Sequence, residues 1–414
     1  MRIGIVGLGY VGLPLLVAFA REGHEVTGFD VSVSLLEALR SGKSHVEDIS
    51  ETELAAVSGL AKWSDQPEDL AECDAIVICV PTPLTENREP DLGALEASGR
   101  TIGSIIRSGQ LIVLESTTYP GTTRECLIPI LEQGGLVAGE DFAVAYSPER
   151  VDPGRTDHTL RTTPKVLGGL TEDCLARATE LYSIVCDHVL PVSSLEAAEL
   201  TKLLENIFRS VNIALVNEIA MLADRMGIDI WEVVDAAATK PYGFMRFEPG
   251  PGMGGHCLPV DPFYLAWRAR QFDMSTEFIE LAGKVNQQMP YYCVDRIARS
   301  LNDRAMAVSG SKVLLVGVSY KSGVGDMREA PALRIARLLI EEGAQVSYHD
   351  EHVPSIERFG LESVDLNAGL ESCDIAVIVT AHAGVDHAEV VAKAPFTLDF
   401  RGVTGPDSDR SERL

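Results

Sequence analysis

The sequence has few basic residues, few aromatic residues and no long apolar run. Lys and Arg together number 35 against 61 Asp and Glu, which gives a net charge of −26 at pH 7. A protein of this charge repels nucleic acid and anionic membrane surfaces, so neither is expected as a partner. An anionic small molecule remains compatible with it, because a helix N-terminus and a few convergent Arg or Lys side chains create a local positive site.

Paired cysteines and targeting signals are also missing. The eight cysteines form no Cys-x-x-Cys pair and no tight Cys/His cluster of zinc-ligand spacing, so we expect reduced thiols and no metal. The chain opens Met-Arg-Ile-Gly-Ile-Val-Gly without signal-peptide architecture, and no stretch is long and apolar enough to span a bilayer. We therefore expect a cytoplasmic protein.

The remaining composition is that of a folded protein with several domains. Hydrophobic residues make up 46% and charged residues 23% of 414 residues, enough for two or three cores. We expect an α/β fold in which two Rossmann-like, doubly wound parallel-sheet domains are joined by a long central helix. The predicted domains are 1–192, which binds the cofactor, 193–304, a helical connector and dimerisation region, and 305–414, the second Rossmann-like domain.

A glycine-rich turn follows the first predicted strand. Gly7-Leu-Gly9-Tyr10-Val11-Gly12 lies between an apolar strand and an apolar helical pattern. Gly7 permits the tight turn, Gly9 lets a pyrophosphate approach the backbone, and Gly12 allows close helix packing. The next strand ends at Asp30, where Rossmann folds bind ribose hydroxyls, with no Arg directly after it. The pattern predicts NAD rather than NADP, although a glycine-rich turn without a cofactor is the alternative.

Further strands end in polar turns. The strands at 75–80 and 111–114 run into Thr82, Ser116 and Thr117, which we expect to line the cofactor cleft because ligands bind beyond the carboxyl ends of parallel strands. Ordinary turn chemistry is the alternative for each of them. A second set of strands at 311–317, 345–350 and 374–380 echoes the first without a full Gly-x-Gly-x-x-Gly. That half is expected to hold a different nucleotide or a sugar nucleotide, or to serve as scaffold.

A long helix is predicted between the two halves. Ser193-x-x-Glu196 is typical of a capping box, and apolar residues then recur at helical spacing as far as Leu222. Lys202 and Asn206 are four residues apart and share one helical face within the apolar stripe. A functional pair and a snorkelling Lys beside a surface Asn both explain this pattern. An apolar helix of this length also suggests a dimer contact.

The segment from 240 to 261 is too rich in Gly and Pro for regular structure. It contains Gly254-Gly-His256-Cys257-Leu-Pro-Val260-Asp261. The glycines let a substrate approach the sulfur of Cys257, and Asp261 can share its site if a helix begins after Pro259. Composition alone favours an inert, buried thiol for Cys257.

The whole chain resembles the nucleotide-diphospho-sugar 6-dehydrogenases, the family of UDP-glucose, GDP-mannose and UDP-N-acetylhexosamine dehydrogenases. The resemblance is carried by spaced motifs in order: Gly7–Gly12, Val80-Pro-Thr-Pro83, Ser116-Thr-Thr-Tyr-Pro-Gly121, Ser147-Pro-Glu149-Arg150, Glu199-Leu-Thr-Lys202-x-x-x-Asn206, Gly254–Asp261, Gly317-Val-Ser-Tyr-Lys321 and Asp326-Met-Arg328.

The resemblance implies a four-electron oxidation of C6 from alcohol to carboxylate, with two NAD reduced in turn. It implies that Cys257 captures the aldehyde and forms a thioester. Lys202 and Asn206 are implied to bind the oxyanion, while Asp261 and Glu149 handle protons or position water and Thr117 orders that water. For the ligands it implies cofactor contacts from Gly7, Gly9, Tyr10, Val11, Gly12, Asp30, Thr82, Thr117 and Arg328, and substrate contacts from Glu149, Arg150, Lys202, Asn206, Arg246, Gly254 and Lys321, with Arg246 reaching a neighbouring subunit. A homodimer or dimer of dimers serving polysaccharide or glycoside biosynthesis is implied as well.

Two departures from the glucose enzymes favour the N-acetylhexosamine branch. Pro153 occupies a position where glucose enzymes tend to have an acid, and His256 and Val260 replace the usual Ser and Lys. UDP-N-acetylglucosamine is the first expected substrate, and UDP-N-acetylmannosamine, UDP-glucose and TDP-glucose are the alternatives. His256 is equally compatible with loop packing. A two-electron hydroxyacid dehydrogenase and an inactive sugar-nucleotide binder are the alternative function classes.

Overall fold

Two units make up the molecule, each with its own sheet. The computed structural model describes residues 1–46, 48–85, 87, 89–151, 158–255 and 261–414. Contacts divide it into an N-terminal unit, Met1–Glu205 with Phe263–Ser275, and a C-terminal unit, Asn206–Pro262 with Thr276–Leu414. The predicted domain boundaries after residues 192 and 304 remain predictions.

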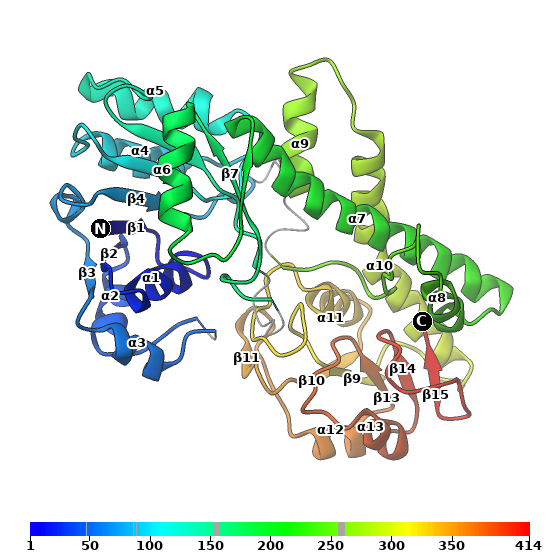
Figure 1. The fold of residues 1–414 in the computed structure, drawn as a ribbon. Helices are drawn as coiled ribbons and strands as arrows, with labels where there is room; N and C mark the ends of the chain where they lie inside the picture. Colours follow the sequence, from blue (N-terminus) through cyan, green and yellow to red (C-terminus); the bar gives the residue numbers. More distant parts are fainter. Residues whose placement is uncertain (47, 86, 88, 152–157, 256–260) are drawn as a thin grey trace. The chain divides into compact units, whose positions relative to one another are not determined.

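The N-terminal unit contains an eight-stranded sheet in the order β3-β2-β1-β4-β5-β6-β7-β8 (Figure 1). The strands are β1 (Arg2–Val6), β2 (Glu25–Phe29), β3 (Ala61–Ser64), β4 (Ala75–Ile78), β5 (Leu111–Leu114), β6 (Ala143–Tyr146), β7 (Lys165–Gly169) and β8 (Val189–Val192). Six strands, β1 to β6, run parallel. The direction then reverses, because β7 pairs antiparallel with β6 and β8 pairs parallel with β7.

Helices cover both faces of this sheet. They are α1 (Gly12–Arg21), α2 (Val33–Arg40), α3 (Glu51–Val57), α4 (Gly93–Gly103), α5 (Ile128–Leu131) and α6 (Glu172–Tyr182), with short turns of helix at Pro67–Leu70, Thr123–Leu127 and Glu132–Gly134. Alternate residues of β4 divide between the two faces: Val77 packs in the core with α1 and α6, and Ile76 packs in the core with α4 and α5. Strands buried on both faces are the mark of a doubly wound sheet.

Four helices, two of them long, follow β8 in the described part of the chain. They are α7 (Leu195–Met226), α8 (Ile230–Ala238), α9 (Asp261–Arg270) and α10 (Glu277–Asn302). The predicted connector is α7, which is 32 residues long. Its start differs slightly from the prediction: the hydroxyl of Ser194 accepts the N–H of Ala197 at 3.1 Å, one residue later than the expected cap at Ser193. In the described part of the chain, no helix is long and apolar enough to cross a membrane.

The C-terminal unit contains a five-stranded sheet in the order β10-β9-β13-β14-β15, with all neighbours parallel. Its elements are β9 (Lys312–Val316), α11 (Pro331–Glu341), β10 (Gln345–His349), α12 (Leu366–Ser372), β13 (Ile375–Ile378), α13 (His387–Lys393), β14 (Thr397–Asp399) and β15 (Ser411–Arg413), with a small hairpin of β11 (Ser355–Ile356) and β12 (Leu361–Glu362) around a helical turn at Glu357–Phe359. One core packs the sheet against α10 and α11, and another packs it against α12 and α13. The predicted fold class is confirmed. The structure adds one feature that was not predicted, the antiparallel pairing of β7 with β6 in the first sheet.

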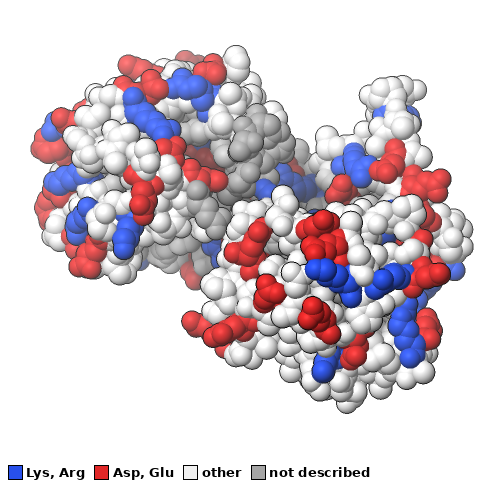
Figure 2. All heavy atoms as spheres, turned by 90° about the horizontal axis from the view of Figure 1, so that it is seen from below, with Lys and Arg blue, Asp and Glu red and all other residues white. Residues whose placement is uncertain are grey.

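Charged side chains are distributed over the surface. Figure 2 shows Asp and Glu side chains interspersed with Lys and Arg on the face that it draws. This view fits a protein with 61 acidic and 35 basic residues.

Candidate functional site

The glycine turn after β1 has the geometry that a pyrophosphate requires. Gly7 has a φ of 89°, where glycine alone is comfortable. A Cβ on Gly12 would lie 1.9 Å from the carbonyl oxygen of Gly7, whereas a Cβ on Gly9 would meet no atom within 4 Å. Helix α1 begins at Gly12, and no side chain caps it. The open space at Gly9 beside a helix N-terminus therefore fits the phosphates of a dinucleotide.

Asp30 lies directly after β2 and beside this turn. Its carboxylate accepts the N–H of Leu8 at 2.9 Å and the N–H of Ser32 at 2.9 Å. Asp30 is only partly buried, so its carboxylate is held in place while it keeps contact with solvent. This arrangement fits the predicted role in binding ribose hydroxyls.

The turns after β4 and β5 are joined by hydrogen bonds. The Thr82 hydroxyl donates to the carbonyl of Thr117 at 2.6 Å, and the Ser116 hydroxyl donates to the carbonyl of Val80 at 2.6 Å. From α9, the Tyr264 hydroxyl donates to the carbonyl of Thr82 at 2.6 Å. The predicted Thr82 and Thr117 therefore share one sheet edge, as the strand ends of a parallel sheet require.

Glu149 follows β6 at the same edge. Its Oε1 accepts the N–H groups of Arg150 at 2.7 Å and Val151 at 2.5 Å, and its Oε2 lies 3.3 Å from the Nζ of Lys165. Burial raises the pKa of the Glu149 carboxyl, and the N–H of Val151 and the charge of Lys202 oppose that rise. A partly buried carboxyl with a raised pKa is suited to proton transfer near neutral pH.

Helix α7 holds two further predicted residues in buried positions. Lys202 is 9% exposed and donates through Nζ to the main-chain carbonyl of Glu149. Asn206, four residues later, is 5% exposed and donates through Nδ2 to the carboxylate of Asp261 at the start of α9. Both side chains have specific partners, so the alternative of a snorkelling Lys and a surface Asn is wrong.

Cys257 lies outside the described residues, as do His256 and Val260. The two glycines before them are described and pack against other residues of the C-terminal unit, to which they belong. A Cβ on Gly254 would lie 2.7 Å from the Cβ of Tyr320, and the N–H of Gly255 donates to the carbonyl of Arg328 at 2.9 Å. The segment that carries Lys321 and Arg328 is therefore next to the glycines that precede Cys257.

The predicted arginines pair with acids of their own unit. Arg150 forms an ion pair with Glu205 at 2.7 Å. Arg246 pairs with Asp235 and, at 3.3 Å, with Glu248, and Arg328 pairs with Asp326 at 2.6 Å. Whether they contact ligands remains a prediction.

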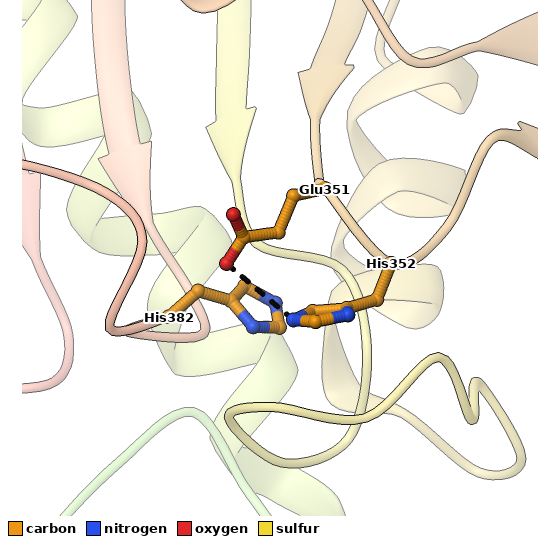
Figure 3. Close-up of side chains that lie close together, drawn as sticks. All are labelled: Glu351, His352 and His382. Atoms are coloured by element: carbon orange, nitrogen blue, oxygen red, sulfur yellow. Dashed lines mark ion pairs between the residues drawn. The ribbon is translucent and has the colours of Figure 1, made fainter. Parts of the chain in front are cut away.

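One group in the described part of the chain has the composition of a metal site. Figure 3 shows Glu351 and His352, which follow β10, beside His382. The Nδ1 of His382 accepts the N–H of Gly323 at 3.1 Å, and its Nε2 lies 3.0 Å from the carboxylate of Asp350. Since both ring nitrogens are already hydrogen-bonded, the group offers two ligands, and we assign no metal to it.

The sequence prediction gave no role to several of the buried charged residues that the structure describes. Glu115, Lys165 and Glu199 are each 2% exposed or less. Glu199 accepts the N–H groups of Gly121 and Thr123 at 2.6 and 2.9 Å, which ties the loop after β5 to α7. Burial raises the pKa of Glu199 to about 7 against these hydrogen bonds. For Glu115, the available signal was its position directly after the fully apolar strand β5.

Comparison with known proteins agrees with this geometry. Three models of the UDP-glucose/GDP-mannose dehydrogenase family match the chain: the NAD binding domain over residues 1–186, the central domain over 196–288 and the UDP binding domain over 314–406. The chain belongs to the UDP-glucose/GDP-mannose dehydrogenase family. It is an NAD-dependent oxidoreductase of the nucleotide-sugar dehydrogenase class, which confirms the predicted family, enzyme class and cofactor.

Individual relatives extend the similarity over the whole chain. UDP-N-acetyl-D-glucosamine 6-dehydrogenase of Pseudomonas aeruginosa is 35% identical and covers 100% of this chain and 99% of its own. Among solved structures, UDP-D-ManNAc dehydrogenase from Pyrococcus horikoshii has a TM-score of 0.91 at 32% identity and covers 100% of this chain and 98% of its own. A UDP-glucose dehydrogenase from Pyrobaculum islandicum has a TM-score of 0.89 at 30% identity and covers 99% and 96%.

Proposed function

We propose that the protein oxidises C6 of UDP-N-acetylglucosamine from alcohol to carboxylate, through a thioester on Cys257. The observation that carries the proposal is the pair of buried polar contacts on α7, Lys202 to Glu149 and Asn206 to Asp261. Relatives named for UDP-N-acetylglucosamine and UDP-N-acetylmannosamine support a UDP-N-acetylhexosamine as the substrate class. His256 and Val260 beside Cys257 support the same branch.

The proposed roles follow from residue chemistry. Gly7, Gly9, Gly12 and Asp30 would hold NAD, which would supply the hydride acceptor for each of the two oxidations. In the first, C6 loses a hydride and the hydroxyl proton passes to a carboxylate, which leaves an aldehyde. The Cys257 thiolate adds to the aldehyde carbon, and Lys202 and Asn206 stabilise the oxyanion that forms.

The second oxidation completes the sequence. Loss of a second hydride from C6 converts the thiohemiacetal into the thioester. Water then attacks the thioester carbonyl, Glu149 or Asp261 takes its proton, and the C–S bond breaks to release the carboxylate and the thiol. The balance is two NADH for each sugar oxidised.

The test compares Cys257→Ser with the wild type and with Cys126→Ser, a thiol outside the proposed site. We expect two NADH per UDP-N-acetylglucosamine from the wild type and from Cys126→Ser, and no carboxylate release from Cys257→Ser. Two NADH per sugar from Cys257→Ser would exclude the thioester. One NADH per sugar from the wild type would identify a two-electron dehydrogenase, and ligand-dependent thermal stabilisation without NADH would identify a binder.

The substrate is tested with a panel of UDP- and TDP-sugars. We expect the largest kcat/KM with UDP-N-acetylglucosamine. A strong response to UDP-glucose alone would overturn the hexosamine assignment, in line with the glucose dehydrogenase among the similar structures.

We also propose that α7 forms a homodimer contact. Large apolar side chains recur on this helix with exposures of 41 to 63%: Leu200, Leu204, Phe208, Leu215, Ile219, Leu222 and Met226. A second copy of the chain would remove this apolar surface from water. Leu222→Glu is expected to convert a dimer to a monomer in sedimentation velocity, and an unchanged mass would exclude this face as the contact.

A further inference from the structure

A buried ionic cluster lies next to Glu149 at the edge of the N-terminal sheet. Lys165 forms an ion pair with Glu115, and its Nζ lies 3.3 Å from the Oε2 of Glu149. The other oxygen of Glu115 accepts the Tyr182 hydroxyl at 3.1 Å and lies 3.8 Å from the Cys79 sulfur. The side chains of Glu115 and Lys165 are 0 and 3% exposed, so water screens their charges very little.

The reversal of β7 explains how Lys165 reaches this edge. Glu115 and Glu149 follow the carboxyl ends of the parallel strands β5 and β6. Lys165 is the first residue of β7, and because β7 runs against β6, its amino end lies at the same edge. A parallel β7 would have placed this lysine at the opposite edge of the sheet.

Three cations among the described residues lie near Glu149, and they contact different atoms. Lys202 donates to the main-chain carbonyl of Glu149. Arg150 pairs with Glu205 and donates to the carbonyl of Pro164 at 2.6 Å. Of these three described cations, Lys165 is the one whose nitrogen lies against the carboxylate itself. The Oε1 atom of that carboxylate already accepts two backbone N–H groups. The contact of Lys165 with Oε2 therefore gives both carboxylate oxygens a partner and fixes the position of the side chain.

We propose that Lys165 is a positioning residue for Glu149: held by Glu115 and Tyr182, it fixes the carboxylate at the sheet edge and favours its ionised form. The inference rests on the proposed role of Glu149 in proton transfer. A lysine between two carboxylates stabilises both anions, so losing it makes Glu149 harder to ionise.

The protonation states of the cluster are consistent with this role. Burial lowers the pKa of Lys165 to about 8, so the lysine is cationic at neutral pH. Burial raises the pKa of Cys79 to about 12 and that of Tyr182 well above its ordinary value, so both stay protonated. Burial also raises the pKa of the neighbouring Cys186 thiol. The charges that act on Glu149 from this cluster are therefore those of Lys165 and Glu115.

The experiment uses a charge-matched double variant. Lys165→Met alone strands the Glu115 carboxylate in the interior and risks unfolding. Glu115→Gln with Lys165→Met removes one charge of each sign, and the amide oxygen can still accept the Tyr182 hydroxyl. Arg296→Met with Asp224→Asn removes a buried ion pair of the C-terminal unit, 2.6 Å long, and is the matched control.

Two measurements are made on the full-length enzyme. The first is the pH profile of kcat/KM for NADH formation with UDP-N-acetylglucosamine. The second is the titration of the Glu149 carboxyl by ¹³C NMR of enzyme labelled at the glutamate side-chain carbonyl, with the resonance assigned by its loss in Glu149→Gln.

We expect the double variant to lose about tenfold or more in kcat, and we expect the acid limb of its profile and the Glu149 titration to move to higher pH. The single variant Lys165→Arg keeps the positive charge, so the titration of its Glu149 carboxyl should lie close to that of the wild type. The control pair should lower the thermal midpoint without moving either curve. A folded double variant with wild-type kcat and an unshifted Glu149 titration would overturn the proposal.

The two proposals fail in different ways. A wild-type enzyme that oxidises no nucleotide sugar defeats the proposed function. The ¹³C titration needs no turnover, so it still decides whether Lys165 controls Glu149.

Discussion

The two units begin with the same strand plan. The N–H of Gly7 donates to the last residue of β2 at 2.9 Å, and the N–H of Gly317 donates to the last residue of β10 at 2.9 Å. The first residues of β1 and β9 donate to Asp74 and Asp374 at 2.8 and 2.7 Å. The backbone hydrogen bonds around the first two strands are therefore equivalent in the two units. The units differ chemically in the segments that follow the first strand.

The acid after the second strand shows this difference. Asp30 accepts two backbone N–H groups and remains partly exposed. Asp350 accepts the N–H of Val318 at 2.7 Å, is 3% exposed and is also bonded to His382. The first carboxylate can reach a ribose, whereas the second is fully used inside its own unit.

The first helix differs as well. Helix α1 begins five residues after Gly7, and α11 begins fourteen residues after Gly317. The longer segment carries Lys321 and Arg328. The N-terminal unit thus places a helix N-terminus at its glycine turn, while the C-terminal unit has a loop with two cations there. We expect this shared arrangement to serve a dinucleotide in the N-terminal unit, which matches the NAD binding domain of the family, and another anionic ligand in the C-terminal unit, which matches its UDP binding domain.

The largest effect is expected from substitutions that disturb the backbone arrangement common to both units, close to the glycine after the first strand. In Gly12→Ala the new Cβ overlaps the carbonyl oxygen of Gly7, and in Gly317→Ala it would lie 2.0 Å from the carbonyl oxygen of Thr380. Each substitution should cost about 3 kcal/mol of folding free energy, measured by urea unfolding. Gly9→Ala meets no atom within 4 Å, so it should fold normally and lose NAD binding. Wild-type stability in Gly12→Ala would contradict the close contact.

The next largest effect is expected on folding stability, from Asp350, the buried acid that follows β10 in the C-terminal unit. Burial opposes its ionisation, yet the hydrogen bonds from His382 and Val318 lower the pKa of Asp350 to about 2 from 3.8. Its carboxylate therefore stabilises the folded state above about pH 4, and this stabilisation disappears as the pH falls through about 2.

Asp350→Asn should consequently cost about 2 kcal/mol near neutral pH and flatten the fall in stability between pH 4 and 2. Urea unfolding across that range measures it, with the exposed neighbour Glu351→Gln as control. Equal acid sensitivity in Asp350→Asn and the wild type would show that this hydrogen-bond network does not govern it.

A smaller effect is expected from the exposed acid. Asp30→Asn should weaken NAD binding about tenfold with little change in unfolding free energy, as measured by calorimetric titration. Asp350→Asn is its matched partner and should leave NAD affinity unchanged while the protein is folded. Equal losses of NAD affinity in both variants would show that Asp30 and Asp350 do not differ in their contribution to NAD binding.

The smallest effect is expected from metal removal. Because both nitrogens of His382 are hydrogen-bonded, Glu351 and His352 alone form a weak site. EDTA should leave the thermal midpoint unchanged, and His352→Ala should do the same. A lowered midpoint with EDTA, abolished by His352→Ala, would reveal a bound ion.

Local patterns predicted much of this molecule. A short apolar strand, a glycine turn and an acid after the next strand define β1, α1 and Asp30, because each step depends on neighbours in sequence. The same logic predicted that Lys202 and Asn206 share one helical face, since helical spacing determines which face a residue occupies, and the structure shows that both are buried.

Other features depend on pairing that no local pattern encodes. A five-residue buried strand has the same sequence signature in either direction, so the reversal of β7 was not predicted. The contact between Lys165 and Glu115 joins residues fifty positions apart and depends on that reversal. Asn206 and Asp261 are also distant in sequence, and their hydrogen bond depends on where α9 begins.

The reversed strand also has a consequence for the order of folding. Tyr146 and Gly168, which pair across β6 and β7, are 22 positions apart in sequence, whereas Ile3 and Ala75, which pair across β1 and β4, are 72 positions apart. Closing the shorter loop costs less chain entropy, so local pairings are favoured early. We expect the edge that holds Glu149 and Lys165 to assemble before the centre of the sheet, which would make this part of the site an early product of folding.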